Sequence, residues 1–308
     1  MNYRWVWRAC AEDVAARLSR ELGLPHAIAR LLSARGVTTP KAAERFLWPR
    51  RDDLHDPYRM ASMGEAVERI WGAIARGEPI VIYGDYDVDG VTSLVLLTKT
   101  LARLGARVSF YVPERLREGY GMHAEAIEAL AAQGGRLLIS VDCGIRAHEV
   151  VERAKALGME AIVTDHHLPE AELPRAVAVL NPRRPDCAYP EKNLAGVGVA
   201  LKLAQALLAR SGQSAELVRL LPLAAIGTIA DVAPLVGENR VIARLGLEGI
   251  RAPEQVGLRA LAEAAGLAAD RPVTSEDVAF RLAPRLNAAG RLSTAQPAIE
   301  LLLTEDAE

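Results

Sequence analysis

One thirteen-residue stretch constrains the fold of this 308-residue chain more than any other: VIYGDYDVDGVTS, from Val81 to Ser93. Its β-favouring start ends at Gly84, a pattern that predicts a buried strand running into a turn. The turn carries carboxylates at alternate positions, Asp85, Asp87 and Asp89, and a helix is predicted after it over residues 92–104. Strand, acidic turn and helix together predict the first part of a βαβ unit.

The three carboxylates of this turn repel one another unless a positive charge neutralises them. A solvated acidic loop is one interpretation, but the carboxyl end of a buried strand is where open α/β sheets bind their ligands. The turn also matches the first half of an EF-hand calcium loop. That loop requires a bidentate Glu where this chain has Leu96, and a helix rather than a strand before it, so we exclude an EF-hand.

Composition limits the classes of protein to which the chain can belong. Its hydrophobic content of 50% is enough for a large core, and its net charge of −2 indicates no globally basic surface for nucleic acid. Cys10, Cys143 and Cys187 are scattered and form no CxxC motif, which is typical of a reducing compartment. The charged start of the chain argues against a signal peptide, and no apolar stretch is long enough to span a membrane. We therefore expect a soluble cytoplasmic protein without membrane contact.

Predicted strands and helices alternate regularly through the middle of the chain. Strands are predicted over 80–83, 108–112, 137–141, 161–164 and 177–180, and helices over 92–104, 124–133, 147–157 and 199–209. This alternation predicts an α/β fold, a parallel sheet with helices on both faces. Short helices predicted over 11–22, 27–34 and 40–47 form a helical leader, and the pattern after Asp231 is mainly helical. We expect a leader (1–62), an α/β domain (63–240) and a helical connector (241–308).

Acidic and histidine residues follow further predicted strands at the point where each strand ends. Asp142 follows strand 137–141, the triplet Asp165-His166-His167 follows strand 161–164, and Asp231 ends an apolar helix predicted over 220–231. A single Asp after a strand is more often a helix N-cap. Because the carboxyl ends of parallel strands meet at one edge of a sheet, these side chains and the acidic turn can nevertheless converge.

Four of these segments resemble, in order, the motifs of the DHH phosphoesterase superfamily: GDYDVDGVTS, SVDCGI, VTDHHLP and IADVAPL. Further segments are similar to the RecJ-like family of single-strand exonucleases: YVPERLREGYGM, LNPRRPDCAYP, LAGVGVALKLAQAL and PRLNAAGRLSTAQPAIELLLTED. The resemblance runs from about Met63 to the end of the sequence. It implies a DHH catalytic domain and a 5′-to-3′ exonuclease of single-stranded DNA that acts in DNA repair and recombination.

The resemblance also implies a role for each acidic and histidine residue. Asp87 and Asp89 are expected to hold one divalent cation each, Asp142 to bridge both, and His166 and Asp231 to complete the shell of the second ion. Asp85 is expected to support the turn or hold a metal-bound water, Asp165 to orient a histidine, and His167 to contact the scissile phosphate. Some branches carry a His where this chain has Tyr83, so we expect a less complete shell for the first ion.

The chemistry of these side chains agrees with that implication. Two dications offset four or five converging carboxylates, and carboxylates with one imidazole suit Mn²⁺ or Mg²⁺, with the imidazole favouring Mn²⁺. Ions about 4 Å apart can activate a water and stabilise both oxygens of an in-line displacement at phosphorus. The predicted reaction is metal-dependent phosphodiester hydrolysis.

Two basic segments are candidates for binding the DNA strand. Arg115, Arg117 and Tyr120 follow a predicted strand, and the resemblance implies that this segment receives a 5′ end, with Arg on phosphate and the aromatic ring near a base. The alternative is a solvated loop, and for Arg117 the two interpretations are balanced. Arg285 and Arg291 are a second candidate phosphate contact, with surface ion pairing as the alternative. Gly196-Val197-Gly198 is a weak phosphate-loop signal before a helix, and we expect a structural turn there.

Two other functions remain as alternatives. One is a DHH phosphoesterase of short oligonucleotides, cyclic dinucleotides or pyrophosphate, although such chains lack the leader and the LNAAGRL segment present here. The other is a non-catalytic DHH-type scaffold in DNA replication, although such relatives lose metal ligands that this chain retains. As partners we expect single-stranded DNA with a 5′ end, and a single-strand-binding protein or a helicase. We also expect the chain to stop short of the DHH-associated domain and OB-fold of RecJ-like proteins, and hence to bind long strands poorly.

Overall fold

The computed structural model describes residues 4, 6, 8–115, 117–267, 271–292 and 294–306. The chain divides into two compact units, Met1–Leu54 and His55–Glu308. Residues 55–62, which the sequence pattern grouped with the leader, belong to the larger unit.

The smaller unit consists of short helices: α1 (Glu12–Leu22), α2 (His26–Ala34), α3 (Pro40–Leu47) and the 3-10 turn η1 (Arg51–Asp53). Its apolar core joins one face of each α-helix through Ala15, Leu18, Ala29, Leu32 and Ala43. At the start of α3 the Thr39 hydroxyl accepts a hydrogen bond from the Ala42 N–H, and Pro40 occupies the first turn, where a missing N–H costs nothing.

The larger unit is built on a five-stranded parallel sheet in the order β2-β1-β3-β4-β5. The strands are β1 (Pro79–Gly84), β2 (Arg107–Tyr111), β3 (Leu137–Val141), β4 (Glu160–Thr164) and β5 (Ala178–Leu180). The predicted parallel sheet is confirmed, and each strand lies within one residue of its predicted bounds. β1, β3 and β4 are buried at almost every position, which explains why their sequences are mostly apolar rather than alternating.

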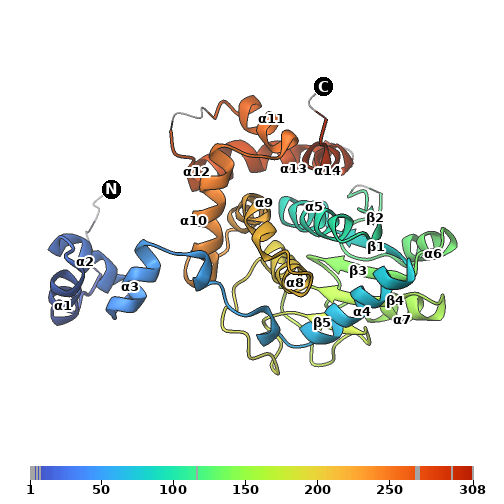
Figure 1. Cartoon of the computed structure of the whole chain (residues 1–308), viewed down its shortest axis with the longest axis horizontal. Helices are drawn as coiled ribbons and strands as arrows, with labels where there is room; N and C mark the ends of the chain where they lie inside the picture. The colour runs from blue at the N-terminus through green and yellow to red at the C-terminus, as the bar shows by residue number, and fades with distance from the viewer. Residues whose placement is uncertain are drawn as a thin grey trace. The chain divides into compact units, whose positions relative to one another are not determined.

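Helices cover both faces of the sheet (Figure 1). On one face α5 (Val88–Arg103) and α8 (Gly196–Arg210) pack together, and α4 (Met63–Arg76) contacts α8 and β5. On the other face lie α6 (Ala124–Ala132) and α7 (His148–Ala156), which share a core with inward-facing side chains of the strands such as Val81, Leu138 and Val163. The predicted two-sided α/β architecture is therefore present.

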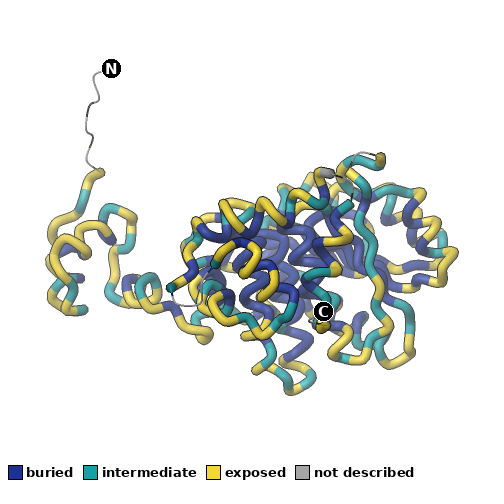
Figure 2. The backbone as a smooth tube through the Cα atoms, turned by 90° about the horizontal axis from the view of Figure 1, so that it is seen from above, coloured by how far each residue is buried: buried dark blue, intermediate teal, exposed yellow. Residues whose placement is uncertain are grey.

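Further helices add a layer beyond α5 and α8. The buried helix α9 (Leu217–Ala230) packs against both, and α10 (Gly237–Arg251) packs against α9. Figure 2 shows the deepest burial along the sheet and these neighbouring helices. The remaining elements are η2 (Pro57–Arg59), η3 (Ser214–Glu216), α11 (Val256–Ala264), α12 (Ser275–Asp277), η4 (Val278–Leu282), α13 (Ala283–Leu292) and α14 (Gln296–Leu303). In the described part of the chain, no helix combines the length and apolar character that crossing a bilayer requires.

Three helices begin at least three residues earlier than predicted, and one of them, α9, starts at Leu217 rather than at residue 220. α5 starts at Val88 rather than at residue 92, because the Asp87 carboxylate caps it by accepting a hydrogen bond from the Gly90 N–H at 3.0 Å. Asp89 therefore lies in the first turn of a helix and not in a loop. α8 starts at Gly196 rather than at residue 199, so the structural turn predicted at 196–198 is wrong and these residues form the first turn of α8.

Candidate metal centre

Three acidic residues leave the sheet side by side at the carboxyl ends of β1, β3 and β4. The register pairs Gly84 with Val141 and Val141 with Thr164, so the next residues, Asp85, Asp142 and Asp165, emerge at the same level. β1 lies between β2 and β3, so the strand order reverses here. Open parallel sheets bind their ligands at this kind of switch point.

The acidic turn presents its three carboxylates in three different ways. The Asp85 carboxylate accepts a hydrogen bond from the Tyr86 N–H at 2.8 Å, and Asp87 caps α5. Asp89 instead reaches the start of α8, where its two oxygens accept hydrogen bonds from the backbone N–H groups of Gly196 (2.6 Å) and Val197 (2.8 Å). Each carboxylate oxygen carries a second lone pair, so these contacts leave room for a cation.

Asp142 has an unusual backbone and an unsatisfied side chain. Its φ of 60° lies in the left-handed region, and the residue is 2% exposed. Its Oδ1 makes no hydrogen bond among the described residues, although the Nε2 of His166 lies 3.1 Å away. A buried carboxylate oxygen without a donor is costly, and such an oxygen fits a metal ligand.

Side chains from four segments form three groups that could each hold a cation, with the ligand atoms of each group within 4.8 Å of one another. The groups are Asp85–Asp87–Asp142, Asp142–His166–His167 and Asp89–His166–Asp231. Asp142 and His166 each belong to two of the groups. The structure thus brings together all five side chains predicted to be metal ligands, and it adds Asp85 and His167 to them.

Four carboxyls of these groups resist ionisation in the absence of a cation: those of Asp85, Asp89, Asp142 and Asp231. Burial, and then the neighbouring charge of Asp87, raises the pKa of Asp85 to about 7 and that of Asp231 to about 6. For the more deeply buried Asp89 and Asp142, burial and repulsion from the other carboxylates raise the pKa well above its usual range. Oxygen ligands that repel one another in a buried site are the donor set that Mn²⁺ and Mg²⁺ prefer.

The Asp165-His166-His167 triplet is held in a fixed arrangement by the first of its residues. Asp165 Oδ1 accepts hydrogen bonds from the N–H groups of His166 (2.7 Å) and His167 (3.0 Å) and lies 2.7 Å from the His167 Nδ1. Its Oδ2 accepts one from the Ile145 N–H at 2.9 Å. Burial disfavours the Asp165 carboxylate, but these donors outweigh it and lower its pKa. Its predicted role in orienting a histidine therefore has a geometric basis.

The two histidines of the triplet differ in charge. Burial, followed by the charge of His167, lowers the pKa of His166 to about 4, so its imidazole is neutral near neutral pH and keeps a lone pair for a metal. The hydrogen bond that the His167 ring donates to Asp165 raises the pKa of His167, which favours its protonated form. His166 is thus suited to coordination and His167 to contact with an anion.

Tyr83 lies outside the metal groups. Its ring packs in the core between the sheet and helices α6 and α7, with its centroid 5.2 Å from that of Tyr111. Its hydroxyl donates a hydrogen bond to the Gly121 carbonyl at 3.2 Å. The Tyr83 side chain therefore supplies no metal ligand. The nearest residue in sequence that belongs to a ligand group is Asp85.

The candidate substrate residues fall into different environments. Arg115 lies over the Tyr86 ring, 5.3 Å from its centroid, and the Tyr120 ring lies 6.2 Å from that of His167, so both border the acidic site. Arg117 is 79% exposed in its side chain and pairs with Glu114 at 3.5 Å, which is a surface contact. Arg285 and Arg291 are exposed on α13, and among the described residues neither forms an ion pair. α13 approaches the acidic turn closely: a Cβ at Gly290 would lie 2.7 Å from the Tyr86 carbonyl oxygen.

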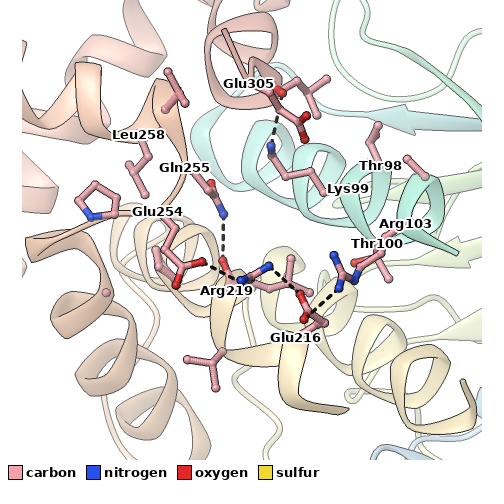
Figure 3. Close-up of a pocket in the computed structure, with 18 of the residues that line it drawn as sticks. Thr98, Lys99, Thr100, Arg103, Glu216, Arg219, Glu254, Gln255, Leu258 and Glu305 are labelled. Carbon is pink, nitrogen blue, oxygen red and sulfur yellow. Dashed lines mark hydrogen bonds and ion pairs between the residues drawn. The ribbon is translucent and has the colours of Figure 1, made fainter. Parts of the chain in front are cut away.

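A pocket of about 750 Å³ lies away from this site, among α5, α9 and α11 (Figure 3). Arg219 lies at its centre and pairs with Glu254 (2.9 Å) and Glu216 (3.2 Å), and Glu216 also pairs with Arg103 (2.9 Å). None of the metal-centre side chains lines this pocket. Because its charged groups neutralise one another, it offers no net charge to an anionic strand.

The backbone donors at the start of α8 are the part of the site that sequence reasoning missed. The glycines at 196 and 198 are a visible sequence signal of a site at this position, but their pattern predicts a turn rather than the start of a helix. The hydrogen bonds to Asp89 span more than a hundred residues of sequence, and no local pattern encodes such a contact.

Known proteins similar to this chain share one family. A profile of the DHH family, N-terminal domain, matches residues 79–228. Two similar proteins are named single-stranded-DNA-specific exonuclease RecJ. That of Bacillus subtilis (strain 168) is 46% identical over 98% of this chain and 38% of its own length. That of Escherichia coli (strain K12) is 38% identical over 96% of this chain and 52% of its own length.

Two solved structures are also similar. RecJ from Thermus thermophilus in complex with Mn²⁺ has a TM-score of 0.84 at 36% identity, over 98% of this chain and 42% of that one. A second structure, of exonuclease RecJ bound to manganese, has a TM-score of 0.74 at 43% identity, over 80% of this chain and 62% of that one. The chain spans about half or less of the length of the curated relatives named above.

Proposed function

Because the chain belongs to the DHH family and is RecJ-like, we propose that it hydrolyses phosphodiester bonds of single-stranded DNA from the 5′ end with the help of two divalent cations. In the cell this activity serves DNA repair and recombination. One observation carries the proposal: Asp142 is shared by two groups of potential ligands at the edge of the sheet, and its buried Oδ1 has no hydrogen-bond partner among the described residues.

The ligands divide between two ions around Asp142. Asp87 and Asp142 would hold one ion, and Asp85 would supply a further oxygen that Tyr83, packed in the core, does not. Asp89, His166 and Asp231 would hold the other ion, and Asp142 would reach it beside His166, whose Nε2 lies 3.1 Å from Asp142 Oδ1. Mn²⁺ and Mg²⁺ both suit this donor set, and the neutral imidazole of His166 favours Mn²⁺. Bound here, the pair of ions supplies an activated water and neutralises charge on the attacking and leaving oxygens.

His167 and Asp165 act on the phosphate from the chain's own side. Asp165 fixes the His167 ring through Nδ1, which leaves Nε2 for a phosphate oxygen. Because the pKa of His167 is raised, the ring can donate from Nε2 in a charge-assisted hydrogen bond. Asp165 is thus a positioning residue, and His167 is the residue that contacts substrate.

The strand itself is held by residues that border the metal groups. Arg115 is placed to bind a phosphate near the acidic turn, and Tyr120 offers a ring face beside His167 for an unstacked base. Arg285 and Arg291 extend the phosphate contacts along α13, the helix that meets the acidic turn at Gly290. A stacking contact of this kind is independent of sequence, as a general exonuclease needs.

We also propose a cellular location, a protein partner and a division of the chain into parts. A cytoplasmic location is supported by the free thiols of Cys10, Cys143 and Cys187. A single-strand-binding protein or a helicase is the protein partner to test. The division into a leader (1–62), a catalytic domain (63–240) and a connector (241–308) stays a proposal for how these roles are distributed.

The test is digestion of single strands labelled at either end, in Mn²⁺, in Mg²⁺ and in EDTA. We expect release of the 5′ label first in either metal and no release in EDTA. Duplex DNA, cyclic dinucleotides and pyrophosphate serve as competing substrates. Faster hydrolysis of a cyclic dinucleotide or of pyrophosphate would favour a small-substrate phosphoesterase, and DNA binding without hydrolysis in any metal would favour a scaffold.

Arg115 and Arg117 provide a matched pair for the substrate contact. Arg115→Ala should raise the KM for 5′-phosphorylated strands by about 10- to 100-fold, since a charge-assisted hydrogen bond contributes about 1.5–3 kcal/mol. Arg117→Ala, which loses only a surface ion pair, should leave the KM unchanged. The preference for a 5′ phosphate over a 5′ hydroxyl is the measurement, and an equal preference in both variants removes Arg115 from the site.

A further inference from the structure

Gly196, the first residue of α8, lies between two of the candidate metal ligands. Its N–H donates a hydrogen bond to Asp89 Oδ2 at 2.6 Å. On its other side, a Cβ placed on Gly196 would lie 2.6 Å from Asp142 Oδ1 and 2.7 Å from the Asp142 Cβ. Side-chain atoms do not approach this closely, so only glycine fits here without moving Asp142.

The two carboxylates that Gly196 separates belong to different ligand groups. Asp89 forms one group with His166 and Asp231, and Asp142 forms another with Asp85 and Asp87. The N–H of the next residue, Val197, donates to Asp89 Oδ1 at 2.8 Å, so both oxygens of Asp89 are fixed by the start of α8. The positive end of the helix dipole also favours a carboxylate at this position.

Asp142 provides independent evidence that the space beside Gly196 belongs to a ligand site. The atom nearest to the hypothetical Cβ is Oδ1, the oxygen that lacks a hydrogen-bond partner among the described residues. A Cβ on Gly196 would thus meet the one atom of the cluster that is both buried and unsatisfied. The close approach of α8 leaves that oxygen directed into the acidic site.

We infer that Gly196 is a positioning residue that sets the spacing between the carboxylates of the two ion groups. The inference rests on the proposed two-cation function. α8 holds Asp89 through its amides and limits the position of Asp142 through the missing side chain. A methyl group at residue 196 displaces Asp142, and the two ions can no longer share it.

Gly198 supplies a matched control on the same turn of α8. It is buried like Gly196, but the three atoms nearest to a Cβ there all belong to the Leu194 side chain, at 3.1 to 3.6 Å. Gly196→Ala and Gly198→Ala therefore make the same chemical change in the same helix, one against the acidic site and one against an apolar side chain. Thermal unfolding without metal establishes that each variant folds.

The readout is Mn²⁺ binding, by calorimetric titration and by electron paramagnetic resonance. We expect the parent protein and Gly198→Ala to bind two ions and to give the exchange-coupled spectrum of a Mn²⁺ pair. Gly196→Ala should bind Mn²⁺ about 10 to 100 times more weakly, the usual effect of disturbing groups that orient ligands, and should lose the coupled spectrum. A parent protein that binds no Mn²⁺ would contradict the proposed function itself. A normal coupled pair in Gly196→Ala would overturn only the role of Gly196.

A second measurement needs no substitution. In the ¹⁵N-labelled parent protein, the amide resonances of Gly196 and Val197 should shift as Mg²⁺ is titrated, because their acceptor becomes a metal ligand. The amide of Gly212, just beyond the far end of α8, should not shift. Unchanged Gly196 and Val197 resonances at saturating Mg²⁺ would overturn the inference even if Gly196→Ala failed to fold.

Discussion

Asp142 shows why a single side chain can determine whether two ions bind. Its left-handed backbone, φ 60°, turns the chain directly after β3, and its buried carboxylate belongs to two ligand groups. Asp and Asn tolerate this backbone region better than other side chains except Gly. Replacement by Ala therefore removes the ligand and also strains the backbone, so Asn is the cleaner substitution.

We expect Asp142→Asn to lower hydrolysis of single-stranded DNA by at least about 100-fold while the thermal unfolding of the metal-free protein stays near that of the parent. The activity falls because the bridging charge is lost, and an outer-shell change alone costs up to about 100-fold. Digestion in Mn²⁺ and unfolding without metal are the two measurements. Near-normal turnover of this variant in Mn²⁺ would show that the two-ion assignment is wrong.

Val232, next to the candidate ligand Asp231, lies in a conformation that suits glycine. Val232 follows the C-cap of α9 and has a φ of 57°. The N–H groups of Val232 and Ala233 donate hydrogen bonds to the carbonyls of Ile229 and Thr228. This is a Schellman ending, in which Gly usually occupies the left-handed position. A β-branched residue there is strained, and the Val232 side chain is 85% exposed, so little packing compensates.

Val232→Gly should therefore raise the free energy of unfolding of the metal-free protein by about 1 kcal/mol, the cost of the left-handed region to an L-residue. Val236 is a matched control, since it is also exposed (48%) but has an extended backbone, φ −123°. Val236→Gly should change stability much less, because Gly loses more entropy on folding but is preferred over Val at an N-cap, the position that Val236 occupies before α10. Urea unfolding measures the free energy of unfolding of both variants. A lower value for Val232→Gly than for the parent would show that Val232 is not strained.

At the scale of elements, the strands were predictable and the helix starts were not. β1, β3 and β4 are mostly apolar runs ended by Gly or Asp, so sequence alone locates them within one residue. The starts of α5 and α8 depend on hydrogen bonds instead: Asp87 caps α5, and the first amides of α8 bind Asp89 of α5. Periodicity finds a helix interior, but it cannot show where a cap or a distant carboxylate begins the helix.

The same limit applies to the candidate site. The motif-bearing positions could be predicted to converge because parallel strands end at one edge. The positions of Arg285 and Arg291 relative to the site depend on how α13 meets the acidic turn, through the close approach of Gly290 to Tyr86. That approach is a packing contact between distant segments, and the sequence carries no periodic signal for it.

A buried ion pair joins α8 to α10. Lys202 Nζ lies 2.7 Å from Glu238 Oε1, and both side chains are fully buried (0%). The Glu238 carboxylate also accepts hydrogen bonds from the His55 N–H and the Tyr189 hydroxyl. Burial lowers the pKa of Lys202, and the charge of Glu238 opposes that shift.

Lys202→Met should lower the free energy of unfolding by about 3–5 kcal/mol, because it leaves the Glu238 charge buried and uncompensated. The double variant Lys202→Met/Glu238→Gln should recover part of the loss, since a neutral amide has no such charge. Urea unfolding of the single and double variants forms the test. A loss below about 1 kcal/mol in Lys202→Met would contradict a buried charge that only Lys202 compensates.

At the scale of the whole molecule, every ligand group lies in the unit His55–Glu308, and the unit Met1–Leu54 has a separate core. A cation that binds only the folded state stabilises it by about 2.7 kcal/mol at a concentration 100 times its Kd. Metal should therefore raise the unfolding temperature of the larger unit alone. Calorimetry with and without Mg²⁺ tests this, and a shift of the smaller unit's transition would contradict it.

The raised pKa of Asp85 makes the stability of the metal-free protein depend on pH. A carboxyl with a pKa of about 7 in the folded state and about 4 in the unfolded chain binds its proton more tightly when folded. Its contribution to the free energy of unfolding is therefore greatest below pH 4 and falls as the pH rises towards 7. His166 acts in the opposite sense, because its lowered pKa makes the folded state less favourable below about pH 6.5.

Asp85→Asn separates these two contributions, because an amide can still accept the Tyr86 N–H and His166 is unchanged. Without metal, we expect Asp85→Asn to gain on the parent in unfolding temperature as the pH rises from about 5 to about 7.5. Saturating Mg²⁺ at the higher pH should reverse the order, because the ions neutralise Asp85 in the parent and find one ligand charge fewer in the variant. Calorimetric scans at both pH values, with and without Mg²⁺, give the four comparisons. An equal Mg²⁺ stabilisation of both proteins at the higher pH would exclude Asp85 from the ion's shell and return it to a role in the turn.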